Sequence, residues 1–90
     1  MDRQEGLEAM ADAATEVLGV ERERITEDAR FKEDLDADSL DLVELVMALE
    51  ERFDIAVPEN ELDGIDTVGA ALTLVLGKVE AKADESPART

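Results

Sequence analysis

The sequence contains no cysteine, histidine, tryptophan or tyrosine, and only two phenylalanines. Without cysteine there is no disulfide, no thiolate nucleophile and no cysteine-ligated metal site. Without histidine the chain lacks the commonest general base and transition-metal ligand, and the imidazole of a serine–histidine pair. Two phenylalanines provide no aromatic platform on which nucleic acid bases could stack. We therefore expect no hydrolytic or redox catalysis by this chain alone, and we expect that it is not an enzyme.

Basic residues are also scarce. The 90 residues include 9 Lys and Arg against 25 Asp and Glu, which gives a net charge of −16 and a pI near 4.1. Nucleic acids and anionic membrane surfaces attract basic patches, so neither is expected as a partner. The expected partners are proteins with basic surfaces, and the charge favours a monomer in solution.

Long apolar segments are absent. The longest apolar run, Ala70 to Leu76, is interrupted by Thr73 and is too short to span a bilayer. The N-terminus lacks the basic start and apolar centre of a signal peptide. We therefore expect a cytoplasmic protein with no membrane span. The length allows one domain at most, and 44% hydrophobic residues are too many for a chain that is disordered throughout.

Hydrophobic periodicity predicts an all-α protein with four helical segments. The first runs from about Glu5 to Leu18, with Gly19 at its C-terminal cap position. The clearest runs from Ser39 to about Phe53. A short segment covers Glu59 to Asp63, and the last helix begins after Thr67, a good N-cap. The apolar positions that define the three longer helices are Leu7, Met10, Ala11, Ala14, Val17 and Leu18; Leu42, Leu45, Val46, Leu49 and Phe53; and Val68, Ala71, Leu72, Val75 and Val79.

Residues 20–37 show no period, and we expect a long loop between the first two helices that isolated apolar residues anchor to the core. These anchors are Val20, Ile25, Phe31 and Leu35. The last residues, 80–90, are small and charged and contain Pro87, which is typical of a disordered tail. The expected organisation is one helical domain over residues 1–79, followed by this tail.

The densest polar cluster runs from Asp34 to Asp41, and three interpretations compete for it. A calcium loop is one, since Asp34, Asp36 and Asp38 match ligand positions of an EF-hand. However, Ser39 stands where the loop needs glycine and Leu45 where it needs glutamate. The second interpretation is structural, because Asp38 or Ser39 can cap the helix and Asp41 complements its dipole.

The third interpretation is covalent modification of Ser39. Free backbone N–H groups at a helix start favour an attached phosphate. The chain offers no base to activate the hydroxyl, so Ser39 would be an acceptor on which another enzyme acts. The surrounding carboxylates oppose a phosphate, so the modifying enzyme would have to supply cations.

The predicted helix from Ser39 to Phe53 has a second face that mixes apolar and acidic residues. Opposite the core positions lie Leu40, Val43, Glu44, Met47 and Glu51, with Glu50 at the edge. Thirteen acidic residues lie between Glu33 and Asp66 against one basic residue, Arg52. Apolar side chains among acids favour a docking surface, whose binding would weaken as salt rises, over a merely solvated face.

These residues resemble the acyl carrier proteins, most closely the free-standing bacterial type of dissociated fatty acid synthesis. The resemblance is carried by Asp38-Ser39-Leu40, the acidic helix through Glu51, and Phe53-Asp54-Ile55. Phe31 to Leu35, Val57-Pro58 and Thr67-Val68-Gly69 fit the same pattern. It covers about Leu7 to Val79. One departure is Asp36, where the family commonly has glycine, and Gly77 and the ending after Val79 also differ.

The resemblance implies a small four-helix bundle of three longer helices and one short one, with a long first loop. It implies that Ser39, between Asp38 and Leu40, carries a 4′-phosphopantetheine arm that a phosphopantetheinyl transferase attaches from coenzyme A. The arm would hold acyl groups as thioesters, with Ile55 and Ile65 near the acyl cavity. Acyl-transferring, condensing and reducing enzymes would dock through their basic surfaces on the residues Asp38, Leu40, Asp41, Val43, Glu44, Met47, Glu50 and Glu51.

Three hypotheses therefore stand at the level of the sequence. The first is an acyl carrier of fatty acid biosynthesis, or of a specialised polyketide-type pathway. The second is an unmodified acidic module that binds a basic partner, in which Ser39 is only a cap. The third is a helical calcium-binding protein.

Overall fold

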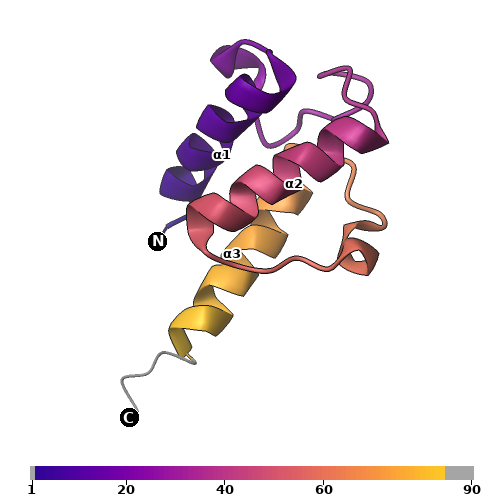
Figure 1. The fold of residues 1–90 in the computed structure, drawn as a ribbon. Helices are drawn as coiled ribbons and strands as arrows, with labels where there is room; N and C mark the ends of the chain where they lie inside the picture. The colour runs from indigo at the N-terminus through magenta and orange to yellow at the C-terminus, as the bar shows by residue number, and fades with distance from the viewer. Residues whose placement is uncertain (1, 85–90) are drawn as a thin grey trace.

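The structure of the chain, a computed structural model, describes residues 2–84 and is built from helices (Figure 1). Three α-helices, α1 (Arg3–Leu18), α2 (Ser39–Phe53) and α3 (Val68–Asp84), pack around one core. Two 3-10 turns, η1 (Arg22–Arg24) and η2 (Glu59–Leu62), lie in the connections. The predicted all-α class is confirmed, and the short predicted segment at residue 59 is a 3-10 turn.

The ends of α1 follow from its capping residues. The Asp2 side chain accepts a hydrogen bond from Glu5 N at 2.8 Å, and Glu5 accepts one from Asp2 N at 3.2 Å. This capping box satisfies free N–H groups, so the helix begins at Arg3, earlier than the periodicity predicts. The predicted C-terminal cap is confirmed, because Gly19 has φ 71°, a conformation that glycine adopts without strain.

The connection from residue 19 to residue 38 is a long loop, as predicted, and it is fastened to the body of the protein. Ile25, Phe31 and Leu35 are buried, and Val20 packs at the edge of the core. Backbone hydrogen bonds join the loop to the start of α3, from Phe31 N to Asp66 O and from Val68 N to Ala29 O, both at 2.9 Å. The loop is therefore an ordered wall of the fold.

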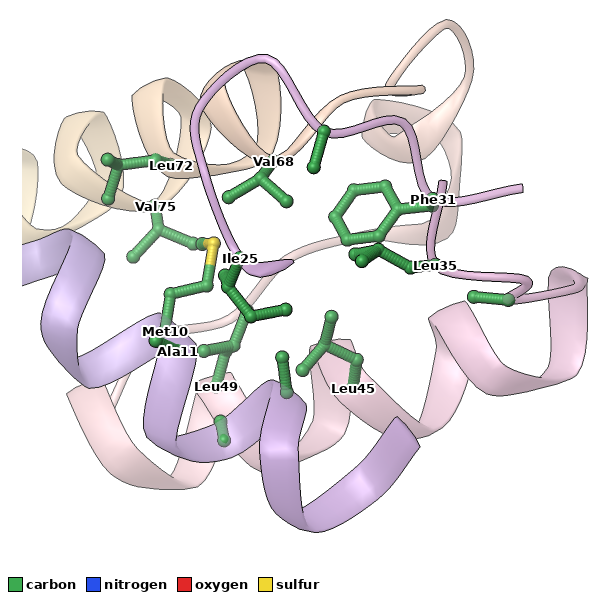
Figure 2. Packing of buried hydrophobic residues seen from close by; sticks show 14 residues of the cluster. Met10, Ala11, Ile25, Phe31, Leu35, Leu45, Leu49, Val68, Leu72 and Val75 are labelled. Atoms are coloured by element: carbon green, nitrogen blue, oxygen red, sulfur yellow. The ribbon is translucent and has the colours of Figure 1, made fainter. Parts of the chain in front are cut away.

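The core lies where the three helices and this loop meet. Figure 2 shows Phe31, Ile25 and Leu35 of the loop pointing toward side chains of α1, α2 and α3. The residues at its centre are nearly inaccessible: Met10, Phe31, Leu45, Leu49, Val68 and Leu72. Burying each such large apolar side chain contributes about 1.5–3 kcal/mol to folding. The predicted apolar positions all lie in or against this core, except Val46, which lines a small cavity described below.

Helix α3 continues to Asp84, so residues 80–84 of the expected tail are helical. Lys82 on this extension pairs with Asp54 at the end of α2, and its hydrogen bond lowers the pKa of the Asp54 carboxyl. Lys78 pairs in the same way with Glu61 of η2 at 2.8 Å. The rest of the expected tail, residues 85–90, lies outside the described residues. Within residues 2–84, no helix is long and apolar enough to cross a membrane.

Arg3 joins three segments that are far apart in the sequence. Its guanidinium donates to both carboxylate oxygens of Glu27, at 2.8 to 3.0 Å, and to Gly69 O at 3.1 Å. Gly69 N in turn donates to Glu27 O at 2.9 Å, and a Cβ at Gly69 would lie 2.9 Å from that oxygen. The start of α1, the loop and the start of α3 are therefore held at one point.

We expect the stabilising effect of Glu27 to depend on pH. The hydrogen bond from Arg3 lowers the pKa of Glu27 below its ordinary value of 4.5, and desolvation opposes it. A carboxyl with a lowered pKa in the folded state stabilises the fold above its unfolded pKa, and this effect is lost as pH falls through the lowered value. The difference in unfolding free energy between wild type and Glu27→Gln should be constant from neutral pH to about pH 5 and vanish in stronger acid. Urea titrations across pH measure it, and a difference that persists in Arg3→Met would contradict this assignment.

Candidate functional site

Ser39 is the first residue of α2, and its side chain is exposed. The cap before it is Asp38, whose Oδ1 accepts a hydrogen bond from Asp41 N at 2.9 Å. Asp41 Oδ2 accepts a hydrogen bond from Asp38 N at 3.2 Å, so the two residues form a capping box. The structural interpretation of the acidic cluster is thus confirmed for Asp38 and Asp41. It leaves the Ser39 hydroxyl free of side-chain hydrogen bonds within residues 2–84.

The turn before the helix is held to the loop by a backbone hydrogen bond. Ala37 is buried, and its N–H donates to Phe31 O at 2.7 Å. The residue before it, Asp36, has φ 56°, in the left-handed region that glycine adopts most easily. Aspartate tolerates this region better than most other residues, which explains how Asp36 can stand where the resembled family commonly has glycine.

A hollow of about 420 Å³ lies beside Ser39. One wall is formed by the loop and α2, and the other by the segment between η2 and α3. Its lining consists of Phe31, Lys32, Glu33, Ser39, Leu42, Leu62, Asp63, Gly64, Ile65 and Asp66. Sequence reasoning did not place residues 62–66 beside Ser39, because this proximity follows from the tertiary contact between the loop and residue 66.

An apolar cavity of about 30 Å³ adjoins the hollow and reaches between the helices. It is lined by Phe31, Leu42, Leu45, Val46, Leu49, Leu62, Ile65 and Ala71. Phe31, Leu42, Leu62 and Ile65 line both spaces. The cavity has room for about one water-sized group, so a longer apolar guest would require these walls to separate. Ile65 lines both spaces, whereas Ile55, the other residue expected near an acyl cavity, packs against the core and lines neither.

The second face of α2 is exposed as its pattern predicts. Leu40 and Met47 are 67% and 57% exposed, and Glu44 and Glu51 lie at the surface with them. Val43 is half-buried. Glu50 at the edge is also half-buried, and its Oε2 accepts a hydrogen bond from Val57 N at 2.7 Å. Its carboxylate therefore has a structural role, because it fastens the connection that follows α2.

Two of the three acidic side chains of the calcium hypothesis, those of Asp34 and Asp38, have other partners. Asp34 accepts a hydrogen bond from Arg30 N at 2.8 Å, and Asp38 is the helix cap. Across residues 2–84, the structure gathers no group of three or more acidic residues that could hold a metal ion.

The fold and the site define a class of protein, a small helical bundle that presents an exposed serine, Ser39, beside the hollow. The family model described as "Phosphopantetheine attachment site" matches residues 8–75. The chain is 47% identical to an acyl carrier protein of Saccharopolyspora erythraea over 98% of its own length and 93% of that protein. It is 46% identical to an acyl carrier protein of Rubrobacter xylanophilus, over 84% of its own length and 94% of that protein. It is 50% identical to one of a Sulfurovum species, over 71% of its own length and 85% of that protein.

The chain belongs to the acyl carrier protein family. Membership implies a covalently attached 4′-phosphopantetheine group, and the family is one of carriers rather than catalysts. The structure fits such a group, because the exposed Ser39, whose hydroxyl takes no part in the capping box, stands at the rim of a hollow that adjoins an apolar cavity. Acyl carriers interact with the enzymes of their pathway, so the chain has enzyme partners.

Proposed function

We propose that Ser39 carries the phosphopantetheine arm and that the chain delivers acyl intermediates to the enzymes of fatty acid biosynthesis. The observation that carries this proposal is the position of Ser39, exposed at the start of α2 beside the hollow. When bound, the arm supplies a terminal thiol that holds acyl groups as thioesters. This sulfur is the one that a chain without cysteine lacks.

The chain's own residues have three tasks in this function. Asp38 and Asp41 fix the first turn of α2, so that Ser39 is held outward for a phosphopantetheinyl transferase. Leu42 and Ile65 line the route from the hollow to the apolar cavity, where a carried acyl chain can be shielded from water. The exposed face of α2 is available to partner enzymes.

Intact-protein mass spectrometry tests the proposal. The chain is incubated with coenzyme A, magnesium and a transferase of broad specificity, and a reaction without coenzyme A is the control. We expect a mass increase of one phosphopantetheine, located by peptide mapping on the segment that contains Ser39. A folded chain that gains no mass with an active transferase would refute the proposal.

We propose that the docking face consists of Leu40, Asp41, Val43, Glu44, Met47 and Glu51, with Asp38 and Glu50 at its margins. Of its apolar members, Leu40 and Met47 are exposed and Val43 is half-buried, and its acidic members supply the field that steers basic surfaces toward it. The soluble enzymes that transfer, condense and reduce acyl groups are the proposed partners, with the cytoplasm as the place of action. A specialised polyketide-type pathway would use the same face and the same arm.

Reversing one charge on this face should weaken docking without unfolding the chain. Glu44 is exposed on α2, and we expect Glu44→Lys to lower kcat/KM with a basic cognate enzyme by about tenfold, mainly through slower association. The matched control is Glu80→Lys, which makes the same charge change at an exposed position of α3. Steady-state kinetics at low and high salt measure the effect, and equal losses in both variants would contradict a local docking face.

The second candidate is an unmodified interaction module, and the exposure of Leu40 and Met47 favours it. In that case a partner would bind the chain equally well with and without the arm. Binding of one cognate enzyme to both forms, measured by calorimetry, separates the two candidates.

A further inference from the structure

Lys32 differs from the other basic residues in the described part of the chain. Arg3, Arg22, Arg30, Arg52, Lys78 and Lys82 each pair with a carboxylate, and Arg24 donates to a backbone carbonyl. Within residues 2–84, the ammonium group of Lys32 has neither kind of partner. Two acidic residues, Glu33 and Asp34, follow Lys32 in the sequence, but both pair with Arg30.

Among the residues that the structure describes, Lys32 is also the one basic residue that lines the hollow beside Ser39. The other ionisable side chains of the lining are Glu33, Asp63 and Asp66, all exposed. Among the described residues, the lining of the hollow thus combines Ser39 with three carboxylates, of which that of Glu33 pairs with Arg30, and with one lysine. A negatively charged group bound to Ser39 would be repelled by these carboxylates and attracted by Lys32.

We propose that Lys32 is a positioning residue that pairs with the phosphodiester of the arm and holds the first part of the arm over the hollow. This inference rests on the proposed function, because it needs the phosphate to be bonded to Ser39 Oγ. A phosphodiester keeps one negative charge, and a lysine ammonium on its flexible stem pairs with phosphate as a point charge. The arm then begins along Gly64 and Ile65, toward the apolar cavity, instead of extending into solvent.

The pairing explains how an acidic surface can accommodate an added phosphate. Carboxylates near a bound phosphate repel it and leave the attached group without a fixed position. One cation placed beside the phosphate can pair with it and so fix the position of the attached group. Because the hollow is open to solvent, salt screens the pairing, and the position of the arm should loosen as ionic strength rises.

The experiment compares backbone amide NMR spectra of the chain before and after the arm is attached. In wild type we expect attachment to shift the amide signals of Gly64, Ile65 and Asp66. In Lys32→Met these shifts should fall to about half or less of the wild-type value, while Lys32→Arg retains them. Lys82→Met is the matched control, since Lys82 is a lysine of α3 that pairs with Asp54 and does not line the hollow. The spectra before attachment also show whether each variant is folded.

The possible results distinguish this inference from the function on which it rests. Equal shifts in wild type and Lys32→Met, or wild-type shifts that do not respond to salt, would overturn the role of Lys32 and leave Ser39 as the attachment residue. A wild-type chain that shows no added mass would overturn the proposed function, and the inference would fall with it. Loss of the shifts in Lys32→Met and their retention in Lys32→Arg would support the pairing.

Discussion

Ser39→Ala is expected to abolish attachment of the phosphopantetheine arm completely. The arm needs an oxygen nucleophile at this position, and alanine supplies none. The chain's other serine provides the matched control, so Ser86→Ala should gain the same mass as wild type. Intact mass after incubation with coenzyme A and transferase gives the result. Modification of Ser39→Ala to the wild-type extent would place the arm on another residue.

This substitution tests function with little effect on stability. The side chain that caps α2 belongs to Asp38, and the Ser39 hydroxyl takes no part in the capping box. Loss of a capping side chain costs about 0.5–2 kcal/mol, whereas an exposed substitution away from such features changes stability by only about 0.5 kcal/mol. The urea unfolding midpoint of Ser39→Ala should therefore match that of wild type. A large fall would mean that the hydroxyl has a structural role.

Phe31→Ala is expected to cause the largest loss of stability, about 3–5 kcal/mol. Phe31 is 1% exposed, and it contributes to the core from the loop while lining the hollow and the apolar cavity. Its backbone also joins the loop to Asp66 and Ala37. Removing the ring leaves a cavity at the point where the loop, α2 and the start of α3 meet. Native proteins unfold with a free energy of about 5–15 kcal/mol, and a domain this small lies toward the low end of that range. The expected loss is therefore comparable to the whole stability, and the variant approaches unfolding at room temperature.

The chain's other phenylalanine is the control for this prediction. Phe53 packs against the edge of the core and is only half-buried, so Phe53→Ala should destabilise the protein less. Circular dichroism during urea titration measures both variants. Equal losses, or a larger loss for Phe53→Ala, would contradict the view that the loop is part of the core.

The helices could be predicted because their determinants are local. Apolar spacing and the cap residues define α2 from Ser39 to Phe53, and Gly19 marks the end of α1. The early start of α1 was missed because Asp2 and Glu5 act through a reciprocal hydrogen bond rather than through hydrophobic spacing. The length of α3 was underestimated because its last residues are small and charged, and the pairing of Lys82 with Asp54 is a tertiary contact.

The candidate site could be predicted only in part. The position of Ser39 at a helix start follows from the sequence, and so does the mixed face of α2. The hollow does not, because its walls come from residues 31–33 and 62–66, which approach through backbone bonds between the loop and Asp66. The same bonds bring the segment that contains Lys32 to the hollow that Ser39 also lines, and composition could not show this arrangement.

The contacts of Arg3 have a practical consequence for anyone who labels or tethers this protein. Arg3 binds Glu27 and the Gly69 carbonyl, and Asp2 closes the first turn of α1, so the second and third residues are integral to the folded structure. A fluorophore or surface linker attached to either side chain would compete with these contacts and loosen the loop that forms one wall beside Ser39. The exposed Thr73 and Gly77 of α3, where a Cβ at Gly77 meets open space, are better points of attachment.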